Sequence, residues 1–381
     1  MFIRSLTLGN ILSFRDPEPL ALQPLNIFIG ANASGKSNLI DCIGLIRALP
    51  GSASNYINDR GGTDSWVWTG AKRGAGIPTI RSEFELAQKV LTYELTFAPV
   101  ERTFAIQFAI QTESLSSSDY TYLQRRAGKL EIGHEGAPGL GDMTASVSPA
   151  ESAFSAYRFP SSPITNTAHK FGDIRIYRDF NTAARDDARI GVSSSGPKYP
   201  LEEDGSNLAL VLQELDFRGA LPGVEKYLQR LAERFEGMNI RAEGGRSQLY
   251  VQERGLGKIS ATRLSDGTLK FLCLMAVLFD PNPAPLICIE EPETGLHPGA
   301  LALVGNALRE ASTRTQLIVT THSDALVDRF TDEPETVVVC ERDFDESTRF
   351  RRLSSERLNE WLEEYTLGEL WRRGEIGGVK H

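Results

Sequence analysis

The sequence has few of the residues that build covalent cross-links or metal centres. Its 381 residues include four cysteines and five histidines, and no two cysteines form a C-x-x-C pair. Disulfide frameworks and zinc ribbons both need closely spaced cysteines, so the sequence favours neither. All four cysteines lie in apolar segments. We therefore expect buried, reduced thiols and a cytoplasmic protein.

Long apolar runs, heptad arrays and an excess of positive charge are also missing. No apolar run approaches the ~18 residues of a membrane span, and the N-terminus lacks a signal-peptide pattern, so we expect no membrane partner. No heptad pattern persists, which argues against a long coiled coil. The formal net charge is −9. This charge argues against a surface coated for nucleic acid but leaves room for a local basic groove.

One short segment is the most informative feature of the chain. Residues 30–38 fit the pattern G-x-x-x-x-G-K-S/T, in which glycines let successive backbone N–H groups face phosphate oxygens. In this pattern Lys36 places its charge on the phosphates, and the Ser37 hydroxyl reaches Mg²⁺. The predicted phosphate-binding residues are Gly30, Ala31, Asn32, Ala33, Ser34, Gly35, Lys36, Ser37 and Asn38.

The surroundings of this segment agree with a phosphate-binding loop. An apolar, β-prone run at residues 25–29 precedes it, and a helical apolar pattern at residues 38–49 follows and stops at Pro50. A strand, a glycine loop and a helix thus occur in the required order. The alternative, a Gly/Ser-rich turn that happens to contain Lys-Ser, does not explain this order.

Further along the chain, the pattern predicts several kinds of element. Alternating residues between 79 and 132 indicate antiparallel strands. Residues 133–170 are rich in Gly, Pro, Ser and Thr, and we expect an irregular surface excursion there. Residues 207–237 have a helical pattern with a break at 219–222. From residue 354 onward we expect mostly helix.

Two acids follow a predicted buried strand at residues 286–290. We expect Glu290 to hold Mg²⁺, through water, and Glu291 to polarise an attacking water molecule. On its own, such a pair could be a solvated strand end. Together with a phosphate loop, it favours a nucleotide site.

Two smaller motifs flank this acidic strand. Ser265 is placed to cap a helix, and either plain capping or a second anion site at the helix start would explain it. His322 follows another apolar run and could hydrogen-bond a γ-phosphate and the attacking water, although a lone histidine at a strand end is more often structural.

The ordered set resembles the ABC-type ATPase heads of the SMC, RecF and overcoming-lysogenisation-defect group, and more closely its compact bacterial AAA-type ATPases without coiled coil or nuclease domain. The resemblance implies an α/β fold: a P-loop NTPase with the two-lobe architecture of an SMC-like head, combining a mixed sheet, an antiparallel β subdomain and a short helical insert. It implies one ATPase domain over 1–381, with an N-lobe at 1–180, an insert at 181–240 and a C-lobe at 241–381.

The resemblance also implies ATP and Mg²⁺ as cofactors, ATP hydrolysis, and a homodimer that closes around two ATP molecules. In this family the signature motif, which includes Ser265 and Gly267, faces the nucleotide of the partner subunit. The implied roles are catalysis by Lys36, Glu291 and His322, metal binding by Ser37 and Glu290, and nucleotide binding in trans by Ser265 and Gly267.

Some positions depart from the family pattern. Asp266 stands where the signature motif has its second glycine, and Glu290 replaces the usual aspartate. The glutamine that contacts Mg²⁺ has no assigned position, since nothing singles out Gln107 or Gln111. The acids at Glu341, Asp343 and Asp345 are either a charged strand end or the remnant of a metal cluster. About 40 residues follow position 341, too few for a nuclease domain.

Three functions remain open at this stage. The first is an ATPase that acts in DNA repair or maintenance, or in antiviral defence against phage, with DNA or an effector protein as partner. The second is a nucleotide-dependent scaffold with little turnover that activates a nuclease on another chain. The third, a transporter ATPase subunit, is disfavoured by Asp266 and by the run of acids at residues 290–293.

Overall fold

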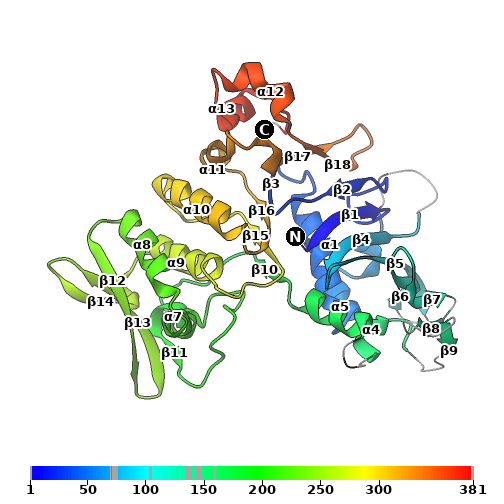
Figure 1. The fold of residues 1–381 in the computed structure, drawn as a ribbon, viewed down its shortest axis with the longest axis horizontal. Coiled ribbons are helices and arrows are strands. Elements are labelled where there is room, and N and C mark those ends of the chain that lie inside the picture. The colour runs from blue at the N-terminus through cyan, green and yellow to red at the C-terminus, as the bar shows by residue number, and fades with distance from the viewer. Residues whose placement is uncertain are drawn as a thin grey trace.

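The computed structural model describes residues 2–68, 70, 76–102, 105–126, 128–133, 140–142, 147–157, 160 and 162–378. Within them the chain forms three sheets, and the central one separates two groups of elements (Figure 1). Among the described residues, no helix is both long and apolar enough to cross a membrane.

The central sheet has six strands, of which five run parallel. In spatial order they are β10 (Arg175–Tyr177), β15 (Leu286–Glu290), β16 (Gln316–Thr320), β3 (Leu25–Ile29), β17 (Val337–Arg342) and the antiparallel edge strand β18 (Thr348–Arg352). β3 and β16 are buried at every position. Burial on both faces explains why these strands are continuous apolar runs.

Successive side chains of the central strands enter two different hydrophobic cores. Ile27 and Ile289 belong to one core, whereas their neighbours Phe28 and Cys288 belong to the other. Helices α1 (Lys36–Ala48) and α5 (Pro163–Gly172) cover one face, and α9 (Asp266–Leu278) and α10 (Pro298–Ala311) cover the other (Figure 1). All four cysteines are free and buried, as expected.

An eight-stranded antiparallel sheet covers the α1 side of the molecule. Its strands, in spatial order, are β2 (Pro19–Ala21), β1 (Ile3–Gly9), β4 (Thr79–Leu86), β5 (Lys89–Arg102), β6 (Ala105–Ser116), β7 (Thr121–Arg126), β8 (Lys129–Gly133) and β9 (Leu140–Asp142). The short helices α2 (Ala53–Asn58), α3 (Thr63–Trp66) and α4 (Ala153–Ala156) accompany it. The predicted antiparallel strands between 79 and 132 are confirmed.

The expectation of an irregular excursion over residues 133–170 is wrong in part. The segment contributes β9, α4 and most of α5, and α5 buries Ile164, Ala168 and Phe171. These residues repeat at helical spacing, but the many polar residues between them obscured the pattern. Residues 147–152 are irregular, as expected, and the rest of that expectation concerns residues 134–139, 143–146, 158, 159 and 161, which lie outside the described residues.

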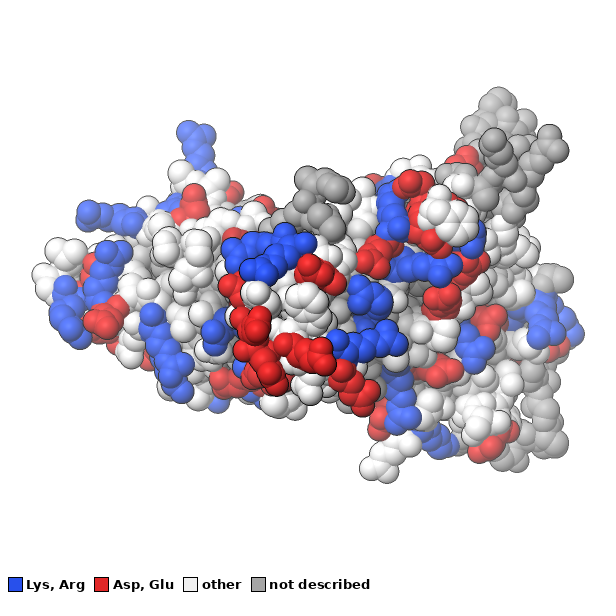
Figure 2. Space-filling view, turned by 90° about the horizontal axis from the view of Figure 1, so that it is seen from above, with Lys and Arg blue, Asp and Glu red and all other residues white. Residues whose placement is uncertain are grey.

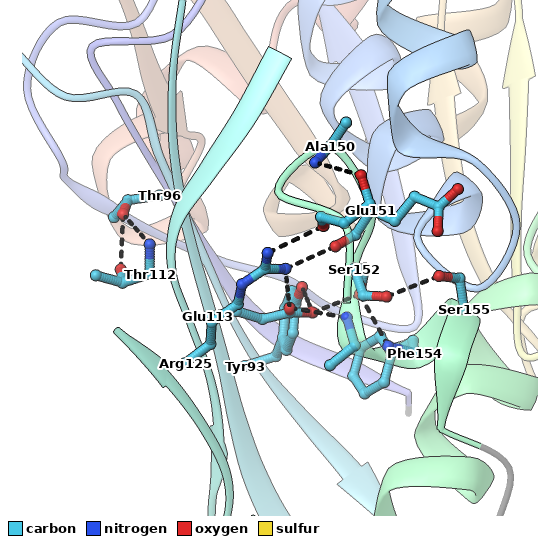
Figure 3. A network of polar contacts seen from close by, with 12 residues as sticks. Tyr93, Thr96, Thr112, Glu113, Arg125, Ala150, Glu151, Ser152, Phe154 and Ser155 are labelled. Atoms are coloured by element: carbon cyan, nitrogen blue, oxygen red, sulfur yellow. Dashed lines mark hydrogen bonds and ion pairs between the residues drawn. The ribbon is translucent and has the colours of Figure 1, made fainter. Parts of the chain in front are cut away.

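A buried cluster of an ion pair on β6 and β7 and a tyrosine on β5 joins three strands of the antiparallel sheet (Figure 3). Glu113 of β6 and Arg125 of β7 are 0% and 1% exposed, respectively, and their closest charged atoms are 4.0 Å apart. The Glu113 carboxylate accepts hydrogen bonds from Tyr93 Oη at 2.9 Å, from the Ser152 hydroxyl and from the Ala153 N–H. Arg125 donates to the Glu151 and Ser148 carbonyls. The cluster therefore fastens the start of α4 to the sheet.

The other side of the molecule carries a small sheet and two longer helices. Its strands are β11 (Val192–Ser193), β12 (Phe235–Glu243), β13 (Arg246–Glu253) and β14 (Gly257–Ser260), and its helices are α6 (Asp187–Ile190), α7 (Leu208–Phe217), α8 (Leu221–Leu231) and η1 (Ala261–Arg263). The predicted helical break at 219–222 is confirmed in part: residues 218–220 separate α7 from α8, which begins at Leu221. The helical pattern expected up to residue 237 is wrong beyond Leu231, because β12 begins at Phe235.

Short helices follow the last strands of the central sheet. They are α11 (Asp324–Val327), η2 (Asp328–Phe330), η3 (Pro334–Thr336), α12 (Ser355–Leu362) and α13 (Leu367–Arg373). Thr366 and Glu369 form a reciprocal capping box at the start of α13. The helical end of the chain expected from residue 354 is confirmed. Figure 2, seen from the side of these helices, shows acidic side chains gathered near them with basic side chains interspersed.

Candidate functional site

The phosphate loop lies between β3 and α1, as the sequence predicts. Gly30 and Gly35 have φ values of +153° and +104°. A Cβ at Gly30 would overlap the Cys340 carbonyl oxygen, and one at Gly35 would overlap the Thr348 side chain. Glycine is therefore required at both positions by the backbone conformation and by the closeness of β17 and β18.

The β17–β18 hairpin holds the loop from one side. Arg342 Nε donates to the Ala33 carbonyl at 2.7 Å, and Thr348 Oγ1 donates to the Ser34 carbonyl at 2.9 Å. These contacts join residues more than 300 positions apart in the sequence. They fix the loop before any phosphate binds, which lowers the entropy cost of binding.

The Lys36 ammonium folds back onto its own loop. Nζ donates to the Gly30 carbonyl at 2.8 Å and to the Ala31 carbonyl at 2.9 Å. The side chain is nearly buried, and burial lowers the pKa of the ammonium. A phosphate at the loop would offer Lys36 a charged partner in place of two neutral carbonyls.

The acids and the histidine meet the loop because their strands are parallel. Glu290 pairs with Thr320, and Thr320 pairs with Phe28, so the carboxyl ends of three strands align. The Glu291 N–H donates to the Thr320 carbonyl at 2.9 Å. Residues that lie far apart in the chain thus form one edge of the sheet, where open α/β sheets bind ligands.

Glu291 and His322 line the same pocket as the phosphate loop. The pocket has a volume of ≈ 450 Å³ and also includes Arg342. Glu291 is 49% exposed, and its Oε1 lies 3.5 Å from His322 Nε2. Glu291 has a φ of +44°, a conformation that is costly for a residue with a side chain and is concentrated at functional sites.

Glu290 is more buried than Glu291 and lies beside Ser37. Burial raises the pKa of its carboxyl group, and Arg178 and the Ser37 hydroxyl oppose this rise. Its Oε1 atom is shielded from solvent and makes no hydrogen bond in the described structure. The oxygen donors of Ser37 and Glu290 are of the type that Mg²⁺ prefers, so these residues fit the expected metal.

The loop also fits the triphosphate of ATP. Its residues Asn32 to Asn38 line the pocket, and backbone N–H groups at the start of a helix are suited to bind phosphate oxygens. Lys36 and the start of α1 supply positive charge at the same place. The predicted site residues Gly30 to Asn38, Glu290, Glu291 and His322 are therefore brought together.

Ser265 and Gly267 lie elsewhere and do not line this pocket. Ser265 is the N-cap of α9, where its hydroxyl accepts a hydrogen bond from the Thr268 N–H at 3.1 Å. Asp266 pairs with Arg189 of α6, and Gly267 lies against the Gly295 carbonyl. Ser265 and Asp266 are exposed.

Three further residues at the site carried no predicted role. Arg178 pairs with Glu290 and with Asp41, and Arg342 lines the pocket. Glu293 accepts a hydrogen bond from the His322 backbone N–H at 2.6 Å, and its pKa is raised by burial. Glu293 could have been found from the sequence, since it follows the two acids by two positions. Arg178 and Arg342 could not, because only strand order brings them here.

Two glutamines and an acidic cluster considered from the sequence lie away from this pocket or are paired with arginines. Gln111 lies on β6 of the antiparallel sheet and is not among the residues lining the pocket, whereas Gln107 is on the same strand and its side chain lies outside the described residues. Across the described residues, no group of three or more metal-ligating side chains occurs. Glu341, Asp343 and Asp345 each pair with an arginine: Arg351, Arg349 and Arg15. They are therefore a charged strand end and not a metal cluster.

Comparison with solved structures shows the same fold in SMC heads. The match with an Smc head bound to the C-winged helix domain of ScpA covers 94% of this chain and 99% of that head, with a TM-score of 0.59 and 14% sequence identity. The match with an Smc head from Pyrococcus furiosus, which has an extended coiled coil and is bound to the C-terminal domain of ScpA, covers 95% of this chain and 99% of that head. Its TM-score is 0.59 and the sequence identity is 14%. The match with the SMC head domain from Thermotoga maritima covers 93% of this chain and 100% of that domain, with a TM-score of 0.50 and 15% sequence identity.

Comparison with curated proteins found no match. A family model does match residues 25–328, which is more than half of the chain and includes the phosphate loop, the acidic strand and His322. The fold expected from the resemblance, a P-loop NTPase with SMC-head architecture, is confirmed. The chain belongs to the family described as "AAA domain, putative AbiEii toxin, Type IV TA system", and its fold is that of a compact SMC-like head.

Proposed function

We propose that this chain binds and hydrolyses ATP and that two copies close around two ATP molecules. One observation carries the proposal: the site motifs are divided between two places. The loop, Glu291 and His322 share one pocket, whereas Ser265 and Gly267 lie outside it, and Ser265 is exposed at the start of a long helix. A second copy can supply that helix start to the first copy's nucleotide.

Each residue then has a role that its surroundings support. Backbone N–H groups of the loop and Lys36 hold the phosphates, and Ser37 and Glu290 hold Mg²⁺, which neutralises phosphate charge. Glu291 reaches into the pocket and accepts a proton from the attacking water. His322 lies 3.5 Å from Glu291 and orients that carboxylate, while Glu293 fixes the backbone of His322.

For the biological role we favour a protein partner whose state depends on the nucleotide. Two of the matched SMC heads were solved with ScpA bound, and the family description mentions a toxin–antitoxin system. The net charge of −9 and the mixed charges seen in Figure 2 give less support to DNA as the primary partner. Roles in antiviral defence and in DNA repair both fit such a switch.

Glu291→Gln is the direct test of the proposed chemistry. This variant should bind ATP, hydrolyse it at least ~100-fold more slowly, and accumulate as an ATP-bound dimer, because the general base is removed while binding groups remain. Phosphate release and mass in solution measure the two effects. Hydrolysis at the wild-type rate would show that Glu291 is not the base.

The composite site has its own test. Lys36→Ala should not bind ATP, and Ser265→Arg should obstruct the facing half-site. Each variant alone should be inactive. An equal mixture should recover about a quarter of wild-type activity, because half of the dimers contain one intact site. Failure to recover activity would contradict shared sites. Negligible turnover of the wild-type chain, with and without duplex DNA, would favour the scaffold role.

A further inference from the structure

Arg178 lies at the metal end of the site, although no sequence pattern assigned it a role. It directly follows β10, and β10 pairs in parallel with β15 so that Tyr177 lies opposite Ile289. The next residues along the two strands are Arg178 and Glu290. Figure 1 shows β10 alongside β15 in the central sheet. Strand pairing alone therefore brings an arginine to the carboxylate assigned to the metal.

The Arg178 guanidinium bridges two carboxylates. Nη1 lies 3.0 Å from Glu290 Oε1, and Nη2 lies 2.5 Å from Asp41 Oδ1. Asp41 is on α1, one turn after Ser37. The Glu290 side chain is 12% exposed, and its Oε1 makes no hydrogen bond in the described structure. The ion pair with Arg178 therefore neutralises a largely buried negative charge.

A metal ion and this guanidinium need the same carboxylate. Under the proposed function, Ser37 and Glu290 hold Mg²⁺, which would add two positive charges close to Arg178. Like charges repel more strongly in a partly buried site than in water. Asp41 offers Arg178 a second carboxylate, so the guanidinium can release Glu290 and still keep a charge partner.

We propose that Arg178 is the counter-ion of Glu290 in the metal-free site and competes with the divalent cation for this carboxylate. The inference rests on the proposed role of Glu290 in metal binding. Its consequence is weak binding of the cation alone. The phosphates of the nucleotide supply the additional negative charge that tips the competition, so cation and nucleotide bind together.

The test measures binding of Mn²⁺ to the full chain, with ADP present and absent, from the loss of the free-ion EPR signal. Arg178→Gln should bind Mn²⁺ about fivefold or more tightly than wild type without nucleotide, because the competing charge is gone. Arg178→Lys keeps the charge and should remain closer to wild type. Arg60→Gln is the matched control: Arg60 pairs with Asp41 at 3.3 Å, and Glu290 is not among its ion pairs. It should change Mn²⁺ affinity less than about twofold.

Unchanged or weaker Mn²⁺ binding by Arg178→Gln would overturn the inference, since it would show that Arg178 does not compete with the metal. Thermal unfolding gives a second readout. Without metal, Arg178→Gln should melt below wild type because Glu290 loses its counter-charge, and Mn²⁺ should raise its Tm more than that of wild type. Equal Mn²⁺-induced increases would also contradict the inference.

Glu290→Gln separates this inference from the function on which it rests. If Glu290→Gln leaves Mn²⁺ binding in the presence of ADP unchanged, the assignment of Glu290 to the metal is wrong, whatever Arg178 does. If Glu290→Gln weakens binding but Arg178→Gln has no effect, the metal assignment stands and only the competition fails.

Discussion

Two glutamate–arginine pairs in this chain have opposite surroundings. Glu113 and Arg125 are at most 1% exposed and lie 4.0 Å apart inside the antiparallel sheet. Glu290 and Arg178 are 12% and 40% exposed and lie 3.0 Å apart at the edge of the central sheet. The residue types are the same, so composition does not distinguish the pairs.

The two pairs differ in how completely their atoms are satisfied. Both oxygens of Glu113 accept hydrogen bonds, and Arg125 donates to two carbonyls (Figure 3). The buried Oε1 of Glu290 faces Arg178 at 3.0 Å but makes no hydrogen bond in the described structure, and the carboxylate lies beside the Ser37 hydroxyl. A fully satisfied pair fastens structure, whereas an incompletely satisfied pair leaves atoms for a ligand.

The largest effect on stability should come from Glu113→Ala. Removing this carboxylate leaves Arg125 as an unpaired buried charge, which should lower the free energy of unfolding by about 3–5 kcal/mol. Denaturant unfolding measures the loss. If the cluster is purely structural, ADP affinity of the folded variant should stay within about twofold of wild type. If the free energy of unfolding falls by less than about 1 kcal/mol, the Glu113–Arg125 pair does not hold the start of α4 to the sheet.

Lys36→Met should weaken nucleotide binding strongly but change stability little, the reverse of Glu113→Ala. It keeps the length of the side chain but removes the charge that faces the phosphates, so ADP should bind about 100-fold more weakly, equivalent to ~2.7 kcal/mol. Because burial already lowers the pKa of Lys36, its charge adds little to the fold, and the free energy of unfolding should change by less than about 1 kcal/mol. Calorimetric binding and denaturant unfolding test both halves. If Lys36→Met were strongly destabilised, Lys36 would also be a structural residue and would not differ from Glu113 in this respect.

A pH series on Glu113→Gln sharpens the comparison further. Burial raises the pKa of Glu113 from its ordinary value of 4.5, so the folded chain holds this proton more tightly than the unfolded chain. Stability from this group is therefore present below pH 4.5 and lost as the pH rises through the raised pKa. The unfolding free energy of wild type relative to Glu113→Gln should fall in this window, by about 1.4 kcal/mol per unit of pKa shift. If the difference in unfolding free energy between wild type and Glu113→Gln does not change with pH, the pKa of Glu113 is not raised in the folded chain.

Ser265→Ala should have the smallest overall effect of these variants. This serine caps α9, and its loss should cost about 1 kcal/mol of stability. Ser260→Ala is the control, since Ser260 caps the short helix η1 by accepting a hydrogen bond from the Thr262 N–H. ATP-dependent dimerisation, measured as mass in solution, should decrease for Ser265→Ala alone. If Ser265→Ala and Ser260→Ala show the same ATP-dependent dimerisation, Ser265 acts only as a helix cap.

Much of the site could be predicted from local sequence. The phosphate loop needs glycines, a lysine and a serine at fixed spacing between a strand and a helix, and all of these are adjacent in the chain. The buried strand before Glu290 is apolar because both of its faces are covered. Helix α5 was missed because its few buried positions lie among polar residues.

By itself, the sequence thus determined where the main strands lie, which loop has the phosphate-binding pattern and which acids and histidine follow the strands, because these properties depend on neighbours in the chain. Tertiary structure alone decided that Arg178 faces Glu290, that β17 and β18 clamp the loop, and that Ser265 lies outside the pocket. Strand order and register bring these residues together or keep them apart, and neither can be read from spacing along one strand.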